Sequence, residues 1–226
     1  MSLTLVFDLD GTLAETAPDL IDALNHVLSF DGIEPVPVEA ARSLLGAGGR
    51  ALIQRGYARA GRDLGKERLD DLFNRFLGFY NEHIADKSTL FPGVEACLDR
   101  CREAGWRLAV CTNKMEYSSK LLLEKLGALD RFAFVCGQDT FGLPKPDPRP
   151  LVETVAKAGG RLGRSVMIGD SITDIKTARA AGMPVIAVDF GYTDVPVAEL
   201  GPDRVISHFD ELYEAALNLT NPPLTA

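Results

Sequence analysis

The sequence has few cysteines and no long hydrophobic run, and both shortages narrow the class of protein. Its 226 residues include four cysteines, with no CxxC pair and no nearby histidine at metal spacing, so we expect free thiols in a reducing compartment. These are Cys97, Cys101, Cys111 and Cys136. No apolar stretch approaches the ~18 residues of a spanning helix, and the first residues lack a signal-peptide pattern. The sequence therefore predicts a cytoplasmic protein with no membrane partner.

An excess of positive charge is also missing. Lys and Arg number 24 against 32 Asp and Glu, which gives a net charge of −8 and disfavours nucleic acid as a partner. Hydrophobic residues make up 46% and charged residues 25%, the proportions of a globular rather than a disordered chain. The length fits one large domain, or one domain that carries a smaller insert.

The chain does contain a series of short β-rich runs separated by helical patterns. The runs cover residues 3–8, 107–111, 132–136, 165–168 and 184–189, at a spacing typical of repeated βα units. This pattern predicts an α/β fold with a doubly wound parallel sheet. Residues 16–83 contain only helical patterns, so we expect a small helical cap at 16–83, inserted into a core of 1–15 and 84–226. Strands near 14–18 and 82–90 would cross between the two and act as a hinge.

The first predicted strand ends in FDLDGT, residues 7–12, which contains two carboxylates. Open α/β sheets bind ligands at the carboxyl ends of their strands, so this position suits a functional site. Asp8 could attack an electrophile, and Asp10 could exchange a proton with the leaving group. The alternative is a solvated acidic turn, because turns favour Asp and Gly.

Three later motifs also follow predicted strands. CTNK offers the hydroxyl of Thr112 and a backbone N–H at Asn113 to an anion, although such residues also cap helices. In GLPKPDP, Lys145 lies between prolines that restrict the backbone, whereas a lone lysine is usually a surface residue. IGDSITD places Asp170 at a strand end and Asp174 about one helical turn later, where an acidic residue can also simply stabilise the helix dipole.

The four motifs follow successive predicted strands, so their side chains should converge in one crevice. Three or four carboxylates in one crevice repel one another unless a hard cation lies among them. Mg²⁺, bound by carboxylates, waters and a substrate phosphate, is the usual solution, and Lys145 would add a positive charge. We therefore expect Mg²⁺ as the cofactor and a small anionic phosphomonoester as the substrate.

FDLDGT, CTN, KP and GDSITD, in this order and spacing, resemble the four motifs of the haloacid dehalogenase superfamily over essentially the whole chain. With a helical insert after the first strand, the chain most resembles phosphoglycolate phosphatases. The resemblance implies a Rossmann-like core and a Mg²⁺-dependent phosphatase that converts 2-phosphoglycolate to glycolate and phosphate. The chain departs from the family's TNKP at Met115, which replaces the proline at the helix entry and leaves the phosphate contacts intact.

The resemblance also implies roles for individual residues. Asp8 would form an aspartyl-phosphate, and Asp10 would act first as a general acid and then as a base. Thr112 and Lys145 would hold the phosphoryl group. The implied Mg²⁺ ligands are Asp8, the backbone carbonyl of Asp10, and Asp170, with Asp174 supporting the metal site from close by.

The loop LGAGGR, residues 45–50, is the candidate for substrate selection in the predicted cap. The core motifs contact only the phosphoryl group, so discrimination among phosphomonoesters must come from the cap. Gly48 and Gly49 let backbone amides approach a ligand, and the guanidinium of Arg50 can hold a carboxylate by two hydrogen bonds. The alternative is that Arg50 merely begins a cap helix and lies in solvent.

Other functions share part of this pattern. A dehalogenase would give Asp10 no purpose, because a halide leaving group needs no proton. A phosphomutase, or a phosphatase for another phosphometabolite such as a sugar phosphate, would share every core motif. A phospho-acceptor receiver is shorter and carries its acceptor at a later strand, and a phosphometabolite-binding regulator would be expected to lack Asp8 or Asp10. The oligomeric state, monomer or homodimer, stays open.

Overall fold

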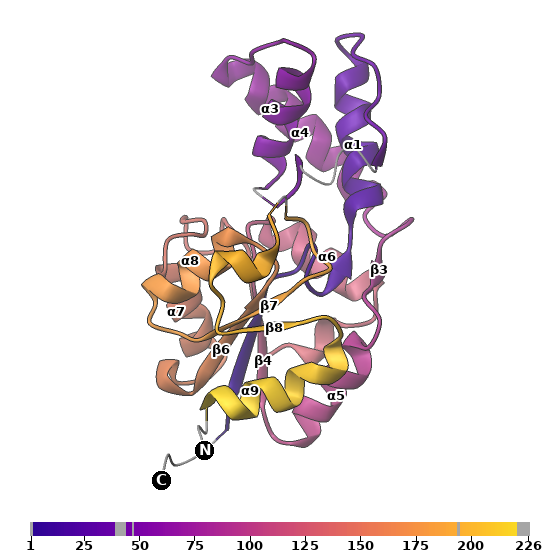
Figure 1. Ribbon diagram of the computed structural model, residues 1–226. Helices are drawn as coiled ribbons and strands as arrows, with labels where there is room; N and C mark the ends of the chain where they lie inside the picture. The colour runs from indigo at the N-terminus through magenta and orange to yellow at the C-terminus, as the bar shows by residue number, and fades with distance from the viewer. Residues whose placement is uncertain (1, 39–43, 47, 194, 221–226) are drawn as a thin grey trace.

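The computed structural model describes residues 2–38, 44–46, 48–193 and 195–220. Within these residues, which Figure 1 draws in colour, a six-stranded parallel sheet has the strand order β5-β4-β1-β6-β7-β8. Its strands are β1 (Thr4–Phe7), β4 (Arg107–Cys111), β5 (Phe134–Cys136), β6 (Ser165–Gly169), β7 (Val185–Val188) and β8 (Arg204–Ile206). The predicted doubly wound sheet is confirmed, and β8 is an additional strand that the sequence pattern did not indicate.

Strand β1 lies at the centre of the sheet and is buried on both faces. Thr4 pairs in register with Arg107 of β4 on one side and with Ser165 of β6 on the other. Successive side chains of a strand point to opposite faces, so Leu5 enters one apolar core and Val6 enters the other. Burial on both faces explains why the strand reads as a continuous apolar run rather than an alternating one.

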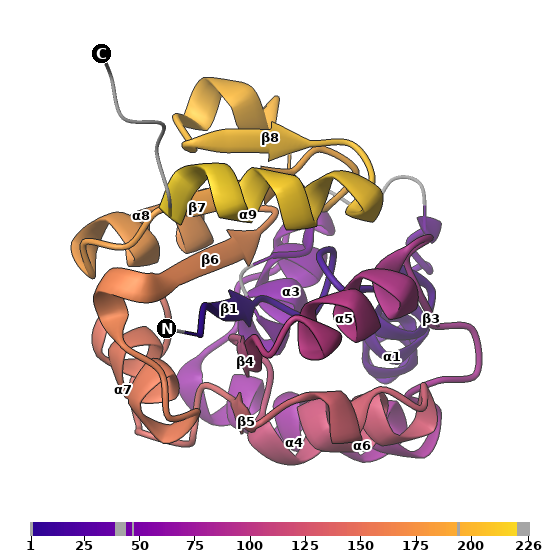
Figure 2. The same cartoon turned by 90° about the horizontal axis from the view of Figure 1, so that it is seen from below.

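Helices cover both faces of the sheet, as the view from below shows (Figure 2). The core that contains Leu5 also holds residues of α5 (Val94–Glu103), α6 (Glu116–Lys125) and α9 (Leu212–Thr220). The core that contains Val6 holds residues of α7 (Arg149–Lys157) and α8 (Ile172–Ala180). This three-layer arrangement leaves the carboxyl ends of the strands open to a ligand on one side of the molecule.

Three further helices stand together beyond that side of the sheet (Figure 1). They are α1 (Ala17–Ser29), α3 (Gly49–Arg59) and α4 (Lys66–Glu82). Apolar stripes pack them against one another, with Leu24 of α1, Leu52 of α3 and Phe76 of α4 all buried. All three lie within residues 16–83, while the division of the chain into a core domain and a cap domain stays a prediction.

The chain leaves and re-enters the core through a small two-stranded sheet. Strand β2 (Ala14–Glu15) pairs antiparallel with β3 (Thr89–Leu90), Ala14 lying opposite Leu90. Asp19, in the first turn of α1, is buried and accepts hydrogen bonds from the backbone N–H groups of Lys87 and Ser88. These contacts hold the start of α1 against the segment that returns to the core.

The four cysteines are buried and free. Two of them lie on one face of α5, and the other two are register partners on β4 and β5. In the part of the chain that the structure describes, no helix has both the length and the apolar character needed to cross a bilayer.

Candidate active site

The carboxyl ends of four adjacent strands, β5, β4, β1 and β6, bring together side chains from segments that are far apart in the sequence. Asp8 and Asp10 follow β1, Thr112 follows β4, Lys145 follows β5 and Asp170 follows β6. These strands are neighbours in the sheet, which is why their carboxyl ends open into one crevice. The crevice therefore holds residues of all four sequence motifs.

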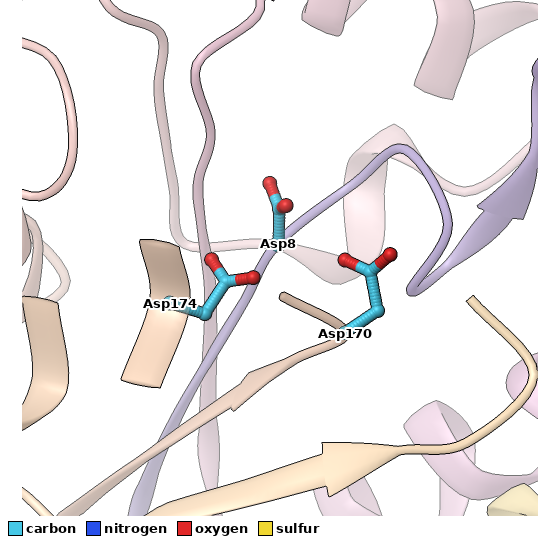
Figure 3. A group of neighbouring side chains, drawn as sticks. All are labelled: Asp8, Asp170 and Asp174. Atoms are coloured by element: carbon cyan, nitrogen blue, oxygen red, sulfur yellow. The ribbon is translucent and has the colours of Figure 1, made fainter. Parts of the chain in front are cut away.

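Three carboxylates, those of Asp8, Asp170 and Asp174, lie around one space (Figure 3). Each offers an oxygen atom, and these oxygens lie within 4.8 Å of one another. Asp170 and Asp174 are buried. The backbone at Gly191 can pass close to Asp170 because glycine has no Cβ. A Cβ built at Gly191 would lie 2.2 Å from the Cβ of Asp170.

Burial and mutual repulsion shift the ionisation of this cluster. Burial raises the pKa of Asp8 to about 6, with Asp174 adding to the shift and Lys145 opposing it. Burial also raises the pKa of Asp170 well above its usual range, reinforced by Asp174 and Asp8. Apart from its ion pair with Lys145, the buried Oδ1 of Asp8 has no hydrogen-bond partner among the described residues. The oxygen-only donor set and this unsatisfied atom fit a divalent metal ion.

Lys145 lies between two of these carboxylates. Its Nζ is 2.9 Å from Asp8 Oδ1 and 2.6 Å from Asp174 Oδ1. Burial alone lowers the pKa of Lys145, but Asp174 and Asp8 outweigh it and raise that pKa above its usual range. The other oxygen of Asp174 accepts hydrogen bonds from the Ser171 backbone N–H and hydroxyl, at 3.1 and 2.7 Å. Asp174 therefore holds the lysine and the start of α8 in place.

The side chain of Asn113 positions the Lys145 segment. Its Oδ1 accepts from the Lys145 backbone N–H at 2.8 Å, and its Nδ2 donates to the Lys145 carbonyl at 3.0 Å. The neighbouring Thr112 hydroxyl accepts from the Lys114 backbone N–H at 3.3 Å, and Thr112 lines the cavity described below. This geometry adds a side-chain role for Asn113 that the sequence reasoning, which used only its backbone, did not include.

Lys114 is a further residue of the site that the sequence reasoning passed over. Its Nζ lies 2.8 and 3.0 Å from the two carboxylate oxygens of Asp10, and Thr16 donates its hydroxyl to the same carboxylate at 2.7 Å. The ammonium lies over the ring of Tyr80, 4.4 Å from its centroid. The sequence did contain an indication of this role, because Lys114 directly follows Thr112 and Asn113 in the CTNK motif.

Tyr192, which the sequence reasoning also missed, connects the acidic cluster to the segment that joins β2 to α1. Its backbone N–H donates to Asp170 at 2.6 Å. Its hydroxyl donates to Glu15 at 2.6 Å and accepts from the backbone N–H groups of Thr16 and Ala17. The signal in the sequence was its place shortly after β7, at the same edge of the sheet as the motifs.

A cavity lies between the acidic site and helices α1, α3 and α4. Its core-side wall includes Asp8, Asp10 and Thr112, and Gly48 and Gly49 line its other side. Apolar side chains cover most of that other side: Leu20, Leu45, Leu52, Phe73, Phe76 and Leu77. A ligand that bridges the two walls would meet polar groups at one end and an apolar surface at the other.

Arg50 does not line this cavity, in contrast to the expectation from the LGAGGR loop. In the first turn of α3, its guanidinium forms an ion pair with Asp70 of α4 and lies 4.4 Å from the centroid of the Phe73 ring. About half of the side chain is exposed. The packing of α3 against α4 supplies these partners, and the structure therefore favours the alternative in which Arg50 begins a helix at the surface.

A family model described as haloacid dehalogenase-like hydrolase matches residues 5–188. The chain belongs to this family. A phosphoglycolate phosphatase of Mesorhizobium japonicum is 51% identical over 208 residues, 92% of each chain. These relationships and the fold identify the protein as a phosphatase of the haloacid dehalogenase superfamily, similar to phosphoglycolate phosphatases.

Two solved structures share the fold of this phosphatase. A predicted phosphoglycolate phosphatase of Haemophilus somnus 129pt superposes with a TM-score of 0.87 at 27% identity, covering 95% of this chain and 97% of the other. A mutant of CbbY of Rhodobacter sphaeroides, in complex with xylulose-(1,5)bisphosphate, superposes with a TM-score of 0.79 at 26% identity, covering 94% and 96%. The predicted family membership and the predicted class of enzyme are confirmed.

Proposed function

We propose that this phosphatase hydrolyses 2-phosphoglycolate to glycolate and phosphate through an aspartyl-phosphate on Asp8, with Mg²⁺ as its cofactor. The observation that carries the proposal is the pairing of Asp8 and Asp10 at the end of β1. Both residues line the cavity, but Asp8 belongs to the acidic cluster and pairs with Lys145, whereas Asp10 pairs with Lys114. The two carboxylates thus have different neighbours, as a nucleophile and a proton donor require.

In the first step, a carboxylate oxygen of Asp8 attacks phosphorus while the bond between phosphorus and the ester oxygen breaks. Asp10 gives its proton to that oxygen, and glycolate leaves. In the second step, Asp10 takes a proton from water, the water oxygen attacks phosphorus, and the bond between phosphorus and Asp8 breaks to release phosphate. Lys145 and Thr112 bind the phosphoryl oxygens throughout.

The ligands proposed for Mg²⁺ are the carboxylates of Asp8 and Asp170 and the backbone carbonyl of Asp10. When bound, the ion would offset the repulsion among the carboxylates and the negative charge of the phosphoryl oxygens. Asp174 would act beside the metal, because both of its oxygens already accept hydrogen bonds from Lys145 or Ser171.

The wall of the cavity favours a small substrate. Apart from the Tyr80 hydroxyl, the described side chains of this wall offer no hydrogen-bond partners to the hydroxyl groups of a sugar, and burying unpaired hydroxyls is unfavourable. Glycolate has only one methylene group and a carboxylate beyond the ester oxygen, so it requires partners for a single polar group, whereas a sugar requires partners for several hydroxyls. The names of the close sequence relatives support the same substrate.

A sugar phosphate is the second candidate substrate. The structural similarity to a CbbY mutant in complex with xylulose-(1,5)bisphosphate favours it. An enzyme of that type, or a phosphomutase that transfers the phosphoryl group back to a sugar, would use the same core residues and differ in what its cap contacts.

A substrate panel tests the proposal. The purified chain with Mg²⁺ would be assayed for phosphate release from 2-phosphoglycolate, its neutral amide phosphoglycolamide, a hexose phosphate and a pentulose bisphosphate. We expect the highest kcat/KM for 2-phosphoglycolate. A higher kcat/KM for either sugar ester would instead support the second candidate, and sugar phosphate interconversion without phosphate release would identify a mutase.

We also infer a cytoplasmic enzyme that acts on a small anionic substrate rather than on nucleic acid. Buried free thiols suit a reducing compartment. The net charge of −8 opposes binding to a phosphate backbone, while the buried ammonium of Lys145 can still bind a single phosphoryl group at close range.

A further inference from the structure

Lys114 is the only cationic side chain among the described residues that line the cavity. It follows β4 and precedes α6, and it is 8% exposed. A buried ammonium needs partners, and Lys114 has the carboxylate of Asp10 on one side and the face of the Tyr80 ring on another. An ammonium carries three N–H donors, and the two oxygens of one carboxylate engage at most two of them. Lys114 therefore keeps a donor for a third group.

The chemistry of 2-phosphoglycolate fixes where its carboxylate must lie relative to Asp10. Only one methylene group separates the ester oxygen from the carboxylate carbon. Asp10 must reach the ester oxygen to protonate it, so the substrate carboxylate must lie within a few ångströms of Asp10. Once Asp10 has given up its proton, the two carboxylates at that separation repel each other unless a cation lies between them. Lys114 Nζ, 2.8 Å from Asp10, is placed to bind both.

Tyr80 supplies a second polar group at this place. It is 1% exposed, lines the cavity, and its hydroxyl has no hydrogen-bond partner among the described residues. A buried hydroxyl without a partner is unfavourable, and a ligand that accepts its hydrogen bond removes that penalty. Burial raises the pKa of Tyr80 well above its usual range, helped by the nearby charge of Asp10, so the hydroxyl remains a donor.

We propose that Lys114 determines the specificity of this phosphatase by binding the carboxylate of the leaving group beside Asp10, with the Tyr80 hydroxyl as a second donor. The proposal rests on the proposed hydrolysis of 2-phosphoglycolate. It transfers to Lys114 the role that the loop sequence suggested for Arg50, whose guanidinium is engaged by Asp70. The substrate carboxylate would then be bound by both predicted domains, since Lys114 follows β4 of the core and Tyr80 lies in α4 of the predicted cap.

The test compares two esters of nearly the same size, one with a carboxylate and one with a neutral amide in its place. For Lys114→Met and the wild-type protein, kcat/KM would be measured with 2-phosphoglycolate and with phosphoglycolamide. We expect the ratio of the two values to fall by about 10- to 100-fold in the variant, the range for a hydrogen bond to a charged group. Lys114→Arg, which keeps the charge, should recover part of the ratio. The matched control Lys120→Met, an exposed lysine of α6 paired with Glu116, should leave the ratio unchanged.

An equal loss on both esters, or an unchanged ratio, would overturn the proposal, because a lysine that only positions Asp10 affects both esters alike. A wild-type protein that prefers another ester would instead overturn the proposed substrate, so the two failures are distinguishable. Tyr80→Phe removes only a hydroxyl and provides an independent reading if Lys114→Met fails to fold. We expect it to lower the same ratio several-fold, and an unchanged ratio in this variant would count against the shared carboxylate site.

Discussion

Asp8 and Lys145 occupy the same buried environment, which acts on their charges in opposite directions. Burial raises the pKa of Asp8 and lowers that of Lys145, and the carboxylates around Lys145 outweigh its burial. Asp8, with a pKa of about 6, is mostly ionised at neutral pH while Lys145 remains an ammonium. The site therefore presents an anionic carboxylate, the proposed nucleophile, next to a cation that can attract phosphoryl oxygens.

Replacing the nucleophile tests its proposed role directly. We expect Asp8→Asn to abolish turnover, because an amide is a far weaker nucleophile and phosphate monoesters hydrolyse extremely slowly without catalysis. Phosphate release would be measured alongside circular dichroism to verify the fold. Retention of about a tenth of the wild-type kcat would contradict a nucleophilic role for Asp8.

The neighbouring carboxylates should separate into a proton-transfer role and a metal-binding role. Asp10→Asn should lower kcat by roughly 10²–10⁴ with little change in Mg²⁺ affinity, because its proposed metal contact is a backbone carbonyl. Asp170→Ala should weaken Mg²⁺ binding, because a carboxylate ligand is lost. Calorimetric titration of both variants with Mg²⁺ measures the difference, and the reverse order of affinities would exchange the two roles.

Arg50 gives a prediction that contrasts with that for Lys114. Because Arg50 is half exposed and paired with Asp70, we expect Arg50→Ala to leave the preference of the enzyme for 2-phosphoglycolate over phosphoglycolamide unchanged. The free energy of unfolding should fall by about 1 kcal/mol or less, as for other exposed ion pairs. Steady-state assays with both esters provide the measurement. Selective loss of activity on the carboxylated ester would restore the role that the loop sequence suggested.

Sequence reasoning could find the residues of the core site because each follows a β-rich run and stands in a short motif. Strand ends of a parallel sheet converge whatever the details of packing, so Asp8, Lys145 and Asp170 could be brought together without coordinates. The contacts that Arg50 and Lys114 make with α4 could not be predicted in this way. Asp70 and Tyr80 belong to α4, and their positions depend on how that helix packs against the rest of the molecule.

At the scale of elements, the length of the apolar run in each strand determines whether the strand can be predicted from the sequence. The apolar runs around β1, β4, β6 and β7 are largely buried on both faces and the run around β5 is partly buried, and all five are recognisable from composition alone. Strand β8 has three residues and only Ile206 is buried, so it carries no comparable signal. The β2–β3 pair has two residues in each strand and is defined by its hydrogen bonds rather than by a hydrophobic pattern.

The contact between the start of α1 and the segment that returns to the core offers a test at this scale. The buried carboxylate of Asp19 accepts from the backbone N–H groups of Lys87 and Ser88 and from the Ser88 hydroxyl, the last at 2.6 Å. Asp19→Ala would leave these donors without their acceptor, and we expect the free energy of unfolding to fall by about 2–3 kcal/mol. Denaturation by urea measures the change.

Asp22 provides the matched control on the same helix. Its carboxylate is 40% exposed and pairs with the ammonium of Lys87. Asp22→Ala should change the free energy of unfolding by less than about 1 kcal/mol, because exposed ion pairs contribute little. Equal losses in Asp19→Ala and Asp22→Ala would show that the buried hydrogen bonds of Asp19 do not stabilise this contact.

At the scale of the whole molecule, the net charge opposes the approach of an anionic substrate, whereas the buried lysines near the site favour its binding. The net charge of −8 repels anionic substrates, and salt screens that repulsion beyond roughly 8–10 Å. Lys114, which lines the cavity, and Lys145, which lies in the acidic cluster beside it, are both buried, and screening is weak at buried positions. We therefore expect selectivity to depend on these few buried charges rather than on the net charge.

The buried acidic cluster also links the stability of the whole protein to pH and to Mg²⁺. The pKa of Asp8 rises on folding from its usual value to about 6, so its contribution to stability is fully present at low pH and is lost as the pH rises through about 6. Asp170 shifts in the same direction. The pKa of Lys145 is raised from an already high value, so its charge does not change over this window. Metal-free protein should therefore become less stable between pH 5 and pH 7.5, through these groups.

Mg²⁺ should reverse that loss, because it binds the deprotonated carboxylates and stabilises only the folded state. At about 100 times the Kd, binding contributes about 2.7 kcal/mol, which raises Tm by roughly 5–10 °C for a chain of this size. Thermal unfolding with EDTA and with MgCl₂ at both pH values measures the effect. We expect the Mg²⁺-dependent rise in Tm to be larger at pH 7.5 than at pH 5 and to be small in Asp170→Ala at both. A rise of the same size at both pH values would mean that Mg²⁺ does not bind through the buried cluster of Asp8 and Asp170.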